Sequence, residues 1–179
     1  PGLVIDSNTI SNVYYYGINY IYYFNGAKVR YNNISTTSTS AYYGLYYFYC
    51  SGNTQPIEFI GNRISGFYGY GTLIYYPYGT ATNRSVIRNN IITYNGTSTS
   101  YYQLFCGYST YTDVINNTAV NAGGASSSTS YCPGYIYFSS YTGSRADNNL
   151  FANYSGGPVM YCYFYGCYSQ DCDYNNLYS

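Results

Sequence analysis

The stretch "RNNII" at residues 88–92 sets a pair of asparagines before a pair of apolar residues, and the chain repeats this step. Comparable steps are "YNNIS" at 31–35, "INNTA" at 115–119, "DNNLF" at 147–151 and "YNNLY" at 174–178. Aligning every step on its second polar residue gives separations of 25, 29, 28, 27, 32 and 27 residues. The aligned residues are Asn8, Asn33, Asn62, Asn90, Asn117, Asn149 and Asn176. A period of this length is typical of solenoids, in which each unit buries its apolar face against its neighbours.

Short runs rich in β-branched and aromatic residues flank each step. One run precedes it, as in "IEFI" at 57–60, and another follows it after a glycine, as in "GLYYFY" at 44–49 and "GTLIYY" at 71–76. Runs of this length bounded by Gly, Asn and Ser predict strands rather than helices. The segments between the runs vary in length, which predicts loops on one face of the coil. We therefore predict an all-β chain in which residues 1–179 form one parallel β-helix domain, with about 28 residues per coil and six to seven coils.

Stacking such coils places equivalent residues in columns, at a spacing of about 4.8 Å. An asparagine at a bend can adopt the left-handed backbone conformation and can hydrogen-bond the next asparagine in its column. The seven aligned asparagines are thus predicted to form a ladder. The many tyrosines are predicted to stack in further columns, because aromatic rings in contact stabilise one another.

The composition argues against several classes of function. The chain has 6 Lys+Arg, 6 Asp+Glu, 33 Tyr and no His, so its formal net charge is zero. Nucleic acid binding needs clustered Lys and Arg, and we expect no nucleic acid partner. No run approaches the roughly 20 apolar residues of a membrane span. A chain without His cannot form a Ser-His-Asp or Cys-His catalytic arrangement.

The acidic residues give little support for carbohydrate cleavage. A glycosidase needs two carboxyl groups about 5 to 9.5 Å apart, and only Asp171 and Asp173 are close together in the sequence. On a strand they would point to the same face, about 7 Å apart, but a solvated turn is the favoured interpretation. A metal site made of these residues and the nearby cysteines matches no paired Cys-x-x-Cys spacing. We assign no catalytic residue, no metal ligand and no cofactor.

An even number of cysteines in a chain rich in Ser, Thr and Asn predicts disulfides and an extracellular or cell-surface location. The candidates are Cys50, Cys106, Cys132, Cys162, Cys167 and Cys172. Cys106 and Cys132 lie 26 residues apart, nearly one coil, which predicts adjacent coils and a distance that a bridge can span. Five N-x-[ST] sequons add N-glycosylation as an expectation. Their acceptors are Asn33, Asn83, Asn95, Asn116 and Asn153.

The repeated steps also carry a family resemblance. "SNTI" at 7–10, "GNRI" at 61–64, "RNNII" and "DNNLF" resemble the repeats of the pectin-lyase-like superfamily over essentially the whole chain. The resemblance implies a right-handed coil of three sheets whose turn carries the asparagine ladder. Members include polysaccharide lyases, glycosidases, phage tailspikes and noncatalytic surface proteins. The clustered acidic and basic residues of the enzymes have no counterpart here, which favours the noncatalytic surface or fibre type.

Three functions are compatible with this sequence, in order of preference. The first is an extracellular structural protein that stacks head to tail on itself into a filament or surface appendage, because apolar "LVI" at 3–5 and the step at 174–178 leave both ends without a cap. The second is a glycan-binding adhesin or fibre module that uses its tyrosines or its Ser/Thr-rich corner loops. The third is a polysaccharide lyase or glycosidase.

Overall fold

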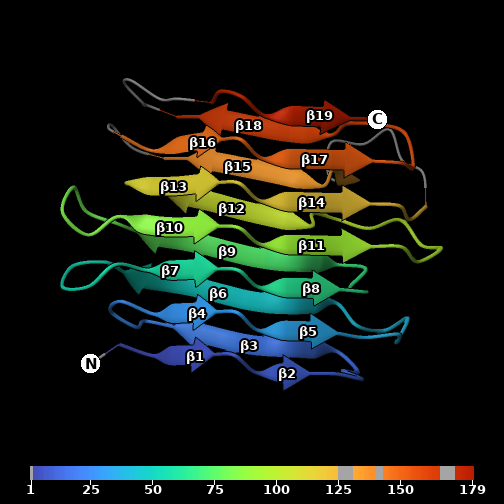
Figure 1. Ribbon diagram of the computed structural model, residues 1–179, viewed down its shortest axis with the longest axis horizontal. Helices are drawn as coiled ribbons and strands as arrows, with labels where there is room; N and C mark the ends of the chain where they lie inside the picture. The colour runs from blue at the N-terminus through green and yellow to red at the C-terminus, as the bar shows by residue number, and fades with distance from the viewer. Residues whose placement is uncertain (1, 125–130, 140–142, 166–171) are drawn as a thin grey trace.

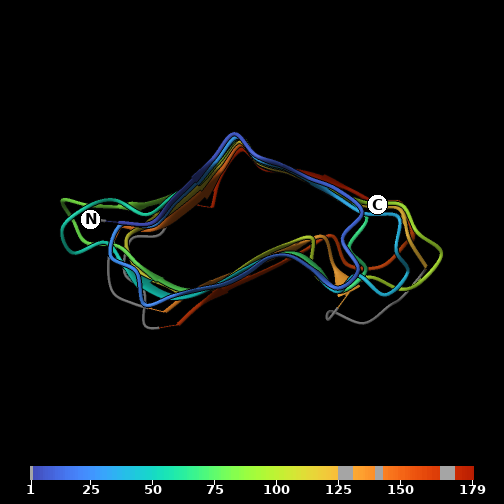
Figure 2. The same cartoon turned by 90° about the horizontal axis from the view of Figure 1, so that it is seen from below.

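The computed structural model describes residues 2–124, 131–139, 143–165 and 172–179. It is all-β, and its strands form three parallel sheets that the chain visits in turn, once per coil (Figure 1). Figures 1 and 2 together show that the coil winds in the right-handed sense from the N-terminus to the C-terminus. The predicted parallel β-helix of six to seven coils is confirmed. The described residues contain no helix with the length and apolar character that crossing a bilayer requires.

Sheet A consists of six three- and four-residue strands that come before the repeated polar step. In spatial order they are β1 (Val4–Asp6), β4 (Lys28–Arg30), β7 (Glu58–Ile60), β10 (Ser85–Arg88), β13 (Thr112–Ile115) and β16 (Arg145–Asp147).

Sheet B consists of the seven strands that directly follow the step. In spatial order they are β2 (Thr9–Ile10), β5 (Asn33–Ser35), β8 (Arg63–Ser65), β11 (Ile91–Tyr94), β14 (Thr118–Asn121), β17 (Leu150–Asn153) and β19 (Asn176–Tyr178).

Sheet C consists of the six longer, aromatic strands. In spatial order they are β3 (Tyr16–Tyr22), β6 (Tyr43–Ser51), β9 (Tyr70–Tyr78), β12 (Leu104–Ser109), β15 (Gly134–Phe138) and β18 (Met160–Phe164). Seen along the coil axis, sheets A and B meet at a single bend and sheet C lies opposite both of them (Figure 2).

The core fills the space between sheet C and the other two sheets. Because the pairing register repeats from coil to coil, each inward position forms a column of buried apolar side chains. Sheet A contributes Val29, Phe59, Ile87, Val114 and Ala146. Sheet B contributes Ile34, Ile64, Ile92, Ala119 and Phe151. Burial of these columns is the main source of stability, since about 25 cal/mol is gained per Å² of apolar surface removed from water.

The bend between sheets A and B contains a residue with positive φ in every coil. These residues are Ser7, Tyr31, Gly61, Asn89, Asn116, Asn148 and Tyr174, with φ from 53° to 66°. Asparagine and glycine tolerate this left-handed conformation best. The residue directly after each of them is an asparagine whose side chain points into the bend and forms the ladder.

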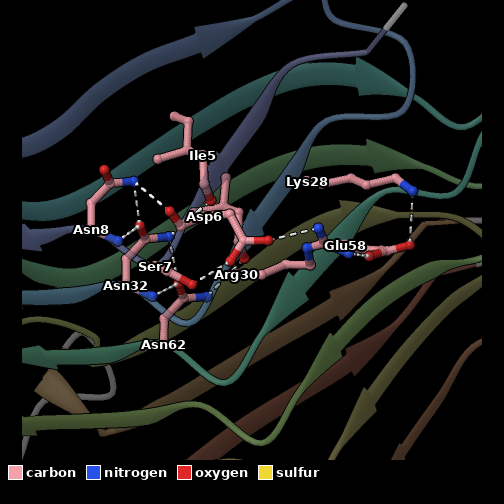
Figure 3. A network of polar contacts seen from close by, with 10 residues as sticks. Ile5, Asp6, Ser7, Asn8, Lys28, Arg30, Asn32, Glu58 and Asn62 are labelled. Carbon is pink, nitrogen blue, oxygen red and sulfur yellow. Dashed lines mark hydrogen bonds and ion pairs between the residues drawn. The ribbon is translucent and has the colours of Figure 1, made fainter.

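The ladder is made by Asn8, Asn32, Asn62, Asn90, Asn117, Asn149 and Asn175. In each of the first six, the backbone N–H and the Nδ2 amide both donate to Oδ1 of the next asparagine, at 2.9–3.1 Å. Figure 3 shows the first three ladder residues, Asn8, Asn32 and Asn62. Nδ2 also donates to a backbone carbonyl of sheet A, such as Val29 O from Asn62. The partners lie 24, 30, 28, 27, 32 and 26 residues apart.

The predicted ladder was therefore wrong at two positions and correct at five. Asn33 and Asn176 begin β5 and β19, and both side chains are exposed. In the steps "YNN", a tyrosine takes the left-handed position that an asparagine holds in "RNN", "INN" and "DNN", so the alignment on the second asparagine was one residue late. The ladder asparagines were also expected to adopt the left-handed conformation themselves. In the structure, the residue before each of them adopts it.

Candidate functional site

The outer face of sheet C carries aromatic rings in three columns that run along the coil axis. The first column is Tyr16, Tyr43, Tyr70 and Tyr101, with ring centroids 5.3–5.6 Å apart and planes within 10°. The second is Tyr22, Phe48, Tyr75, Phe105, Tyr135 and Tyr161, at 4.6–5.6 Å and within 22°. The third is Tyr23, Tyr49, Tyr76, Tyr108, Tyr137 and Tyr163, at 4.2–5.8 Å. The predicted stacking of tyrosines in columns is confirmed.

A groove with a volume of about 490 Å³ lies between the first and second columns. Its lining comes from four successive strands, β6, β9, β12 and β15, and from the loop before β12, so the groove extends along the coil axis. Leu73 lies between the two columns, in register with Tyr46 on β6 and Phe105 on β12. The lining residues are Tyr46, Phe48, Tyr70, Leu73, Tyr75, Tyr102, Phe105, Tyr108 and Tyr135.

The groove exists because the Phe105 ring leans away from its own backbone column. The backbone of Phe105 is in register with Leu73, while Gly107 is the residue in register with Tyr75. Gly107 has no side chain, and the Phe105 ring covers it so closely that a Cβ on Gly107 would overlap the ring. The ring therefore stacks on Tyr75, with centroids 5.6 Å apart, and leaves open the space above Leu73.

The groove has an aromatic, uncharged lining. No Asp, Glu, Lys or Arg lines it, and its polar groups are tyrosine hydroxyls. Desolvation by burial raises the pKa of Tyr70 and of Tyr75, and raises the pKa of Tyr135 to about 12. The phenols therefore stay neutral and keep their O–H donors at neutral pH. Such a surface suits a neutral ligand that combines apolar faces with hydroxyl groups.

A second, smaller hollow of about 250 Å³ lies among the corner loops that follow sheet B. It is lined by Thr36, Thr37, Ser38, Thr39, Gly66, Tyr68, Tyr94, Asn95, Gly96, Thr97 and Ser98. These are the Ser/Thr-rich corner loops named from the sequence as a possible binding surface. This hollow has about half the volume of the groove and fewer aromatic rings in its lining.

The sequon asparagines differ in exposure. Asn33, Asn95 and Asn116 are exposed and Asn83 is half-buried, so glycosylation at these four stays a prediction. Asn153 is 1% exposed, and its Nδ2 donates to Gly156 O at 3.1 Å and to Pro158 O at 2.8 Å. The fold leaves no room for a glycan on the Asn153 nitrogen.

The described cysteines all hold free thiols. The expected proximity of Cys106 and Cys132 was wrong, because Cys106 is in register with Ile136 in the next coil, and Cys132 lies four residues earlier. Cys132 donates instead to Gly134 O at 3.1 Å. Cys50 is buried as well, whereas Cys162 and Cys172 lie with their sulfurs 3.8 Å apart. Cys167 lies outside the described residues.

Most of the described charged side chains lie on or beside the strands of sheet A, and none lines the groove. In the first cluster Arg30 contacts Asp6 at 2.7 Å and Glu58 at 3.4 Å, and Lys28 contacts Glu58 at 3.3 Å (Figure 3). These pairs are partly exposed, so each contributes little to stability.

The second cluster surrounds one buried carboxylate. Asp113 is 6% exposed and accepts hydrogen bonds from both Arg84 and Arg145.

The structure leaves the candidate carboxyl pair of Asp171 and Asp173 incomplete. Asp173 is exposed, and Asp171 lies outside the described residues. Among the residues that the structure describes, no group of three or more His, Cys, Asp or Glu side chains could hold a metal ion.

The groove is the feature that sequence reasoning missed. Two signals pointed to it: a leucine in a strand that is otherwise aromatic on its outer face, and the irregular fourth run "YQLFCGY" at 102–108. No family model, curated protein or solved structure matches the chain.

Proposed function

We propose that the chain is a noncatalytic extracellular module that binds a neutral polysaccharide along the aromatic groove of sheet C. The observation that carries the proposal is the groove of about 490 Å³ between two columns of stacked rings, open along the coil axis and lined without charge. A linear polymer laid in the groove would contact successive coils in the same way. This was the second of the functions expected from the sequence.

The rings supply the affinity in this proposal. The apolar faces of sugar rings pack on aromatic faces, and tyrosine hydroxyls exchange hydrogen bonds with sugar hydroxyls. Stacking between Tyr70 and Tyr43, and between Tyr75 and Phe48, holds the rings in place before a ligand arrives. A preformed surface binds more tightly because less side-chain entropy is lost on binding.

The first test is retention of the full chain on insoluble neutral polysaccharides, such as cellulose, xylan and mannan. We expect saturable binding to at least one of them, and we expect Tyr75→Ala to weaken it by about tenfold to a hundredfold. That range corresponds to the ~1.5–3 kcal/mol gained when a large side chain is buried. Depletion isotherms measure the effect.

The matched control is Tyr76→Ala. Tyr76 is the next residue along β9 and stacks in the third column, at 4.3 Å from Tyr49, but it does not line the groove. Binding by this variant should stay within about twofold of the unchanged chain. Retention should also be constant between about pH 5 and 9, since burial raises the pKa of the groove phenol Tyr135 to about 12 and that phenol stays neutral over this range. Equal losses in both variants, or no retention on any polysaccharide, would overturn the proposal.

A second candidate is the head-to-tail assembly expected from the sequence, and the polarity of the asparagine ladder favours it. The hydrogen bonds between ladder asparagines all run one way, because each is donated to Oδ1 of the asparagine in the next coil toward the C-terminal end, from Asn8 to Asn175. The acceptor Oδ1 of Asn8 in one copy therefore complements the backbone N–H donor of Asn175 in another. Electron microscopy of the 179-residue chain should then show filaments with an axial repeat of about 30 Å. A monodisperse monomer at high concentration contradicts this candidate.

We further propose that the chain is related to the noncatalytic members of the pectin-lyase-like superfamily. The three-sheet right-handed coil and the asparagine ladder at its turn support this relationship. Its low charge supports a surface or fibre role, and most of the charged residues that are described pair with one another at sheet A.

A further inference from the structure

Cys162 and Cys172 bring two thiols together at the C-terminal end of the coil. Cys162 lies on β18 in sheet C, and Cys172 precedes β19 of sheet B, and the two sulfurs are 3.8 Å apart. Cys172 is exposed, whereas Cys50, Cys106 and Cys132 are each 0% exposed. This pair therefore combines contact between two sulfurs with access from solvent.

The surroundings of the pair favour a thiolate on Cys172. Its sulfur accepts a hydrogen bond from Asn175 Nδ2 at 3.6 Å, and when Cys172 is a thiolate it can also accept one from the Cys162 thiol. The hydrogen bond from Cys162 lowers the pKa of the Cys172 thiol to about 7, and the same contact raises the pKa of Cys162. A thiolate is the attacking species in thiol–disulfide exchange.

We propose that Cys162 and Cys172 form a redox site for small disulfides, in which Cys172 attacks, Cys162 resolves, and an intrachain disulfide results. This site is independent of the proposed polysaccharide binding. Cys172 loses its proton, attacks one sulfur of a small disulfide RSSR, and releases RS⁻. Cys162 then loses its proton, attacks the Cys172 sulfur, and releases the second RS⁻. The two cysteines are oxidised, and RSSR is reduced to two thiols.

The product joins sheet C directly to the last coil of sheet B. Within the part of the chain that the structure describes, β18 and β19 are the last strands of their sheets, where they pair with β15 and β17 respectively. Edge strands open more readily than central ones. The disulfide shortens the connection between them and should slow the opening of this end of the coil.

The test treats the full chain with oxidised glutathione and measures the products by mass spectrometry under native conditions. All variants carry Cys167→Ser, because Cys167 lies between the two cysteines in the sequence. We expect the loss of two hydrogens, a cross-link between residues 162 and 172 in chymotryptic peptides, and a rate that rises with pH around a midpoint near 7. Hydrogen exchange in β18 and β19 should slow on oxidation.

Two further variants assign the roles. Cys162→Ser should accumulate a stable mixed disulfide between glutathione and Cys172, because the resolving thiol is absent. Cys172→Ser should react at least tenfold more slowly, because the remaining thiol of Cys162 is less exposed than Cys172 and burial raises its pKa. A persistent mixed disulfide in the chain that retains both cysteines would overturn the proposal. So would a lack of reaction, or equal rates in the two serine variants.

Discussion

Replacement of Asn90 by Ala should lower the free energy of unfolding by about 4 kcal/mol, because this ladder side chain bonds groups in the coils on both sides. Asn90 is 2% exposed, and its Oδ1 accepts the backbone N–H and the Nδ2 amide of Asn62, each at 2.9 Å. Its Nδ2 donates to Phe59 O and to Asn117 Oδ1, also at 2.9 Å. The substitution leaves several of these groups buried without a partner, at about 1–3 kcal/mol each. Denaturant unfolding followed by circular dichroism measures the loss.

Asn33→Ala is the matched control. It removes the same kind of side chain from a residue that the repeat pattern assigned to the ladder but that lies outside it in the structure. Asn33 begins β5 and is exposed, so its removal should change the free energy of unfolding by less than about 0.5 kcal/mol. A result in which Asn33→Ala is as damaging as Asn90→Ala would contradict the ladder described above.

Asn90→Asp should recover stability as the pH falls, because the buried carboxylate faces two carbonyl oxygens and is tolerated only when protonated.

Replacement of Gly44 by Ala should cost about 3 kcal/mol of unfolding free energy, through overpacking. Gly44 stands near the start of β6, where the backbone of sheet C packs against Ile64 of sheet B. A Cβ there would overlap both Gly71 O and Ile64 Cγ2, and it would lie 3.0 Å from Phe67 Cδ2. The first two neighbours are a backbone oxygen of the adjacent coil and a buried side chain, so neither can move without moving a strand. The shift in the midpoint of denaturant unfolding measures the cost.

Gly156→Ala separates overpacking from backbone strain. Gly156 has φ of 74°, and a Cβ there would meet no atom within 4 Å. The substitution should therefore cost only the strain of a left-handed alanine, about 1–2 kcal/mol. If Gly44→Ala proved milder than Gly156→Ala, the close approach of sheets B and C would not have the energetic weight assigned to it.

The fold could be predicted well from the sequence because a solenoid repeats one local pattern in every coil. Each coil contains the same polar step between two β-prone runs, and the period alone determines which strands become neighbours. The single-residue error in the ladder has a physical cause. Tyr31 and Tyr174 adopt the left-handed conformation, which tyrosine seldom does, and composition gave no warning of it.

The candidate sites were predictable only in part. The stacking of tyrosines follows from their columns, but the groove depends on the direction in which the Phe105 ring leans and on the absence of a side chain at Gly107. Neither is visible in a repeat alignment. The cysteine positions depend on the length of the corner segment before Cys132, which displaced Cys132 four residues from the partner of Cys106. Loop length varies from coil to coil, so no period could have placed that residue.

The shared geometry of the bends has a consequence for how such a protein changes its size. Asn62 and Asn90 are equivalent ladder residues 28 positions apart, and each follows a residue with positive φ, Gly61 and Asn89. Deleting residues 62–89 would join Gly61 directly to Asn90. Every column of stacked side chains would then stay continuous and would contain one residue fewer. Tandem duplication of the same segment would lengthen each column by one. Gene rearrangements by whole coils can thus adjust the reach of the molecule in small, regular steps, without requiring a new core.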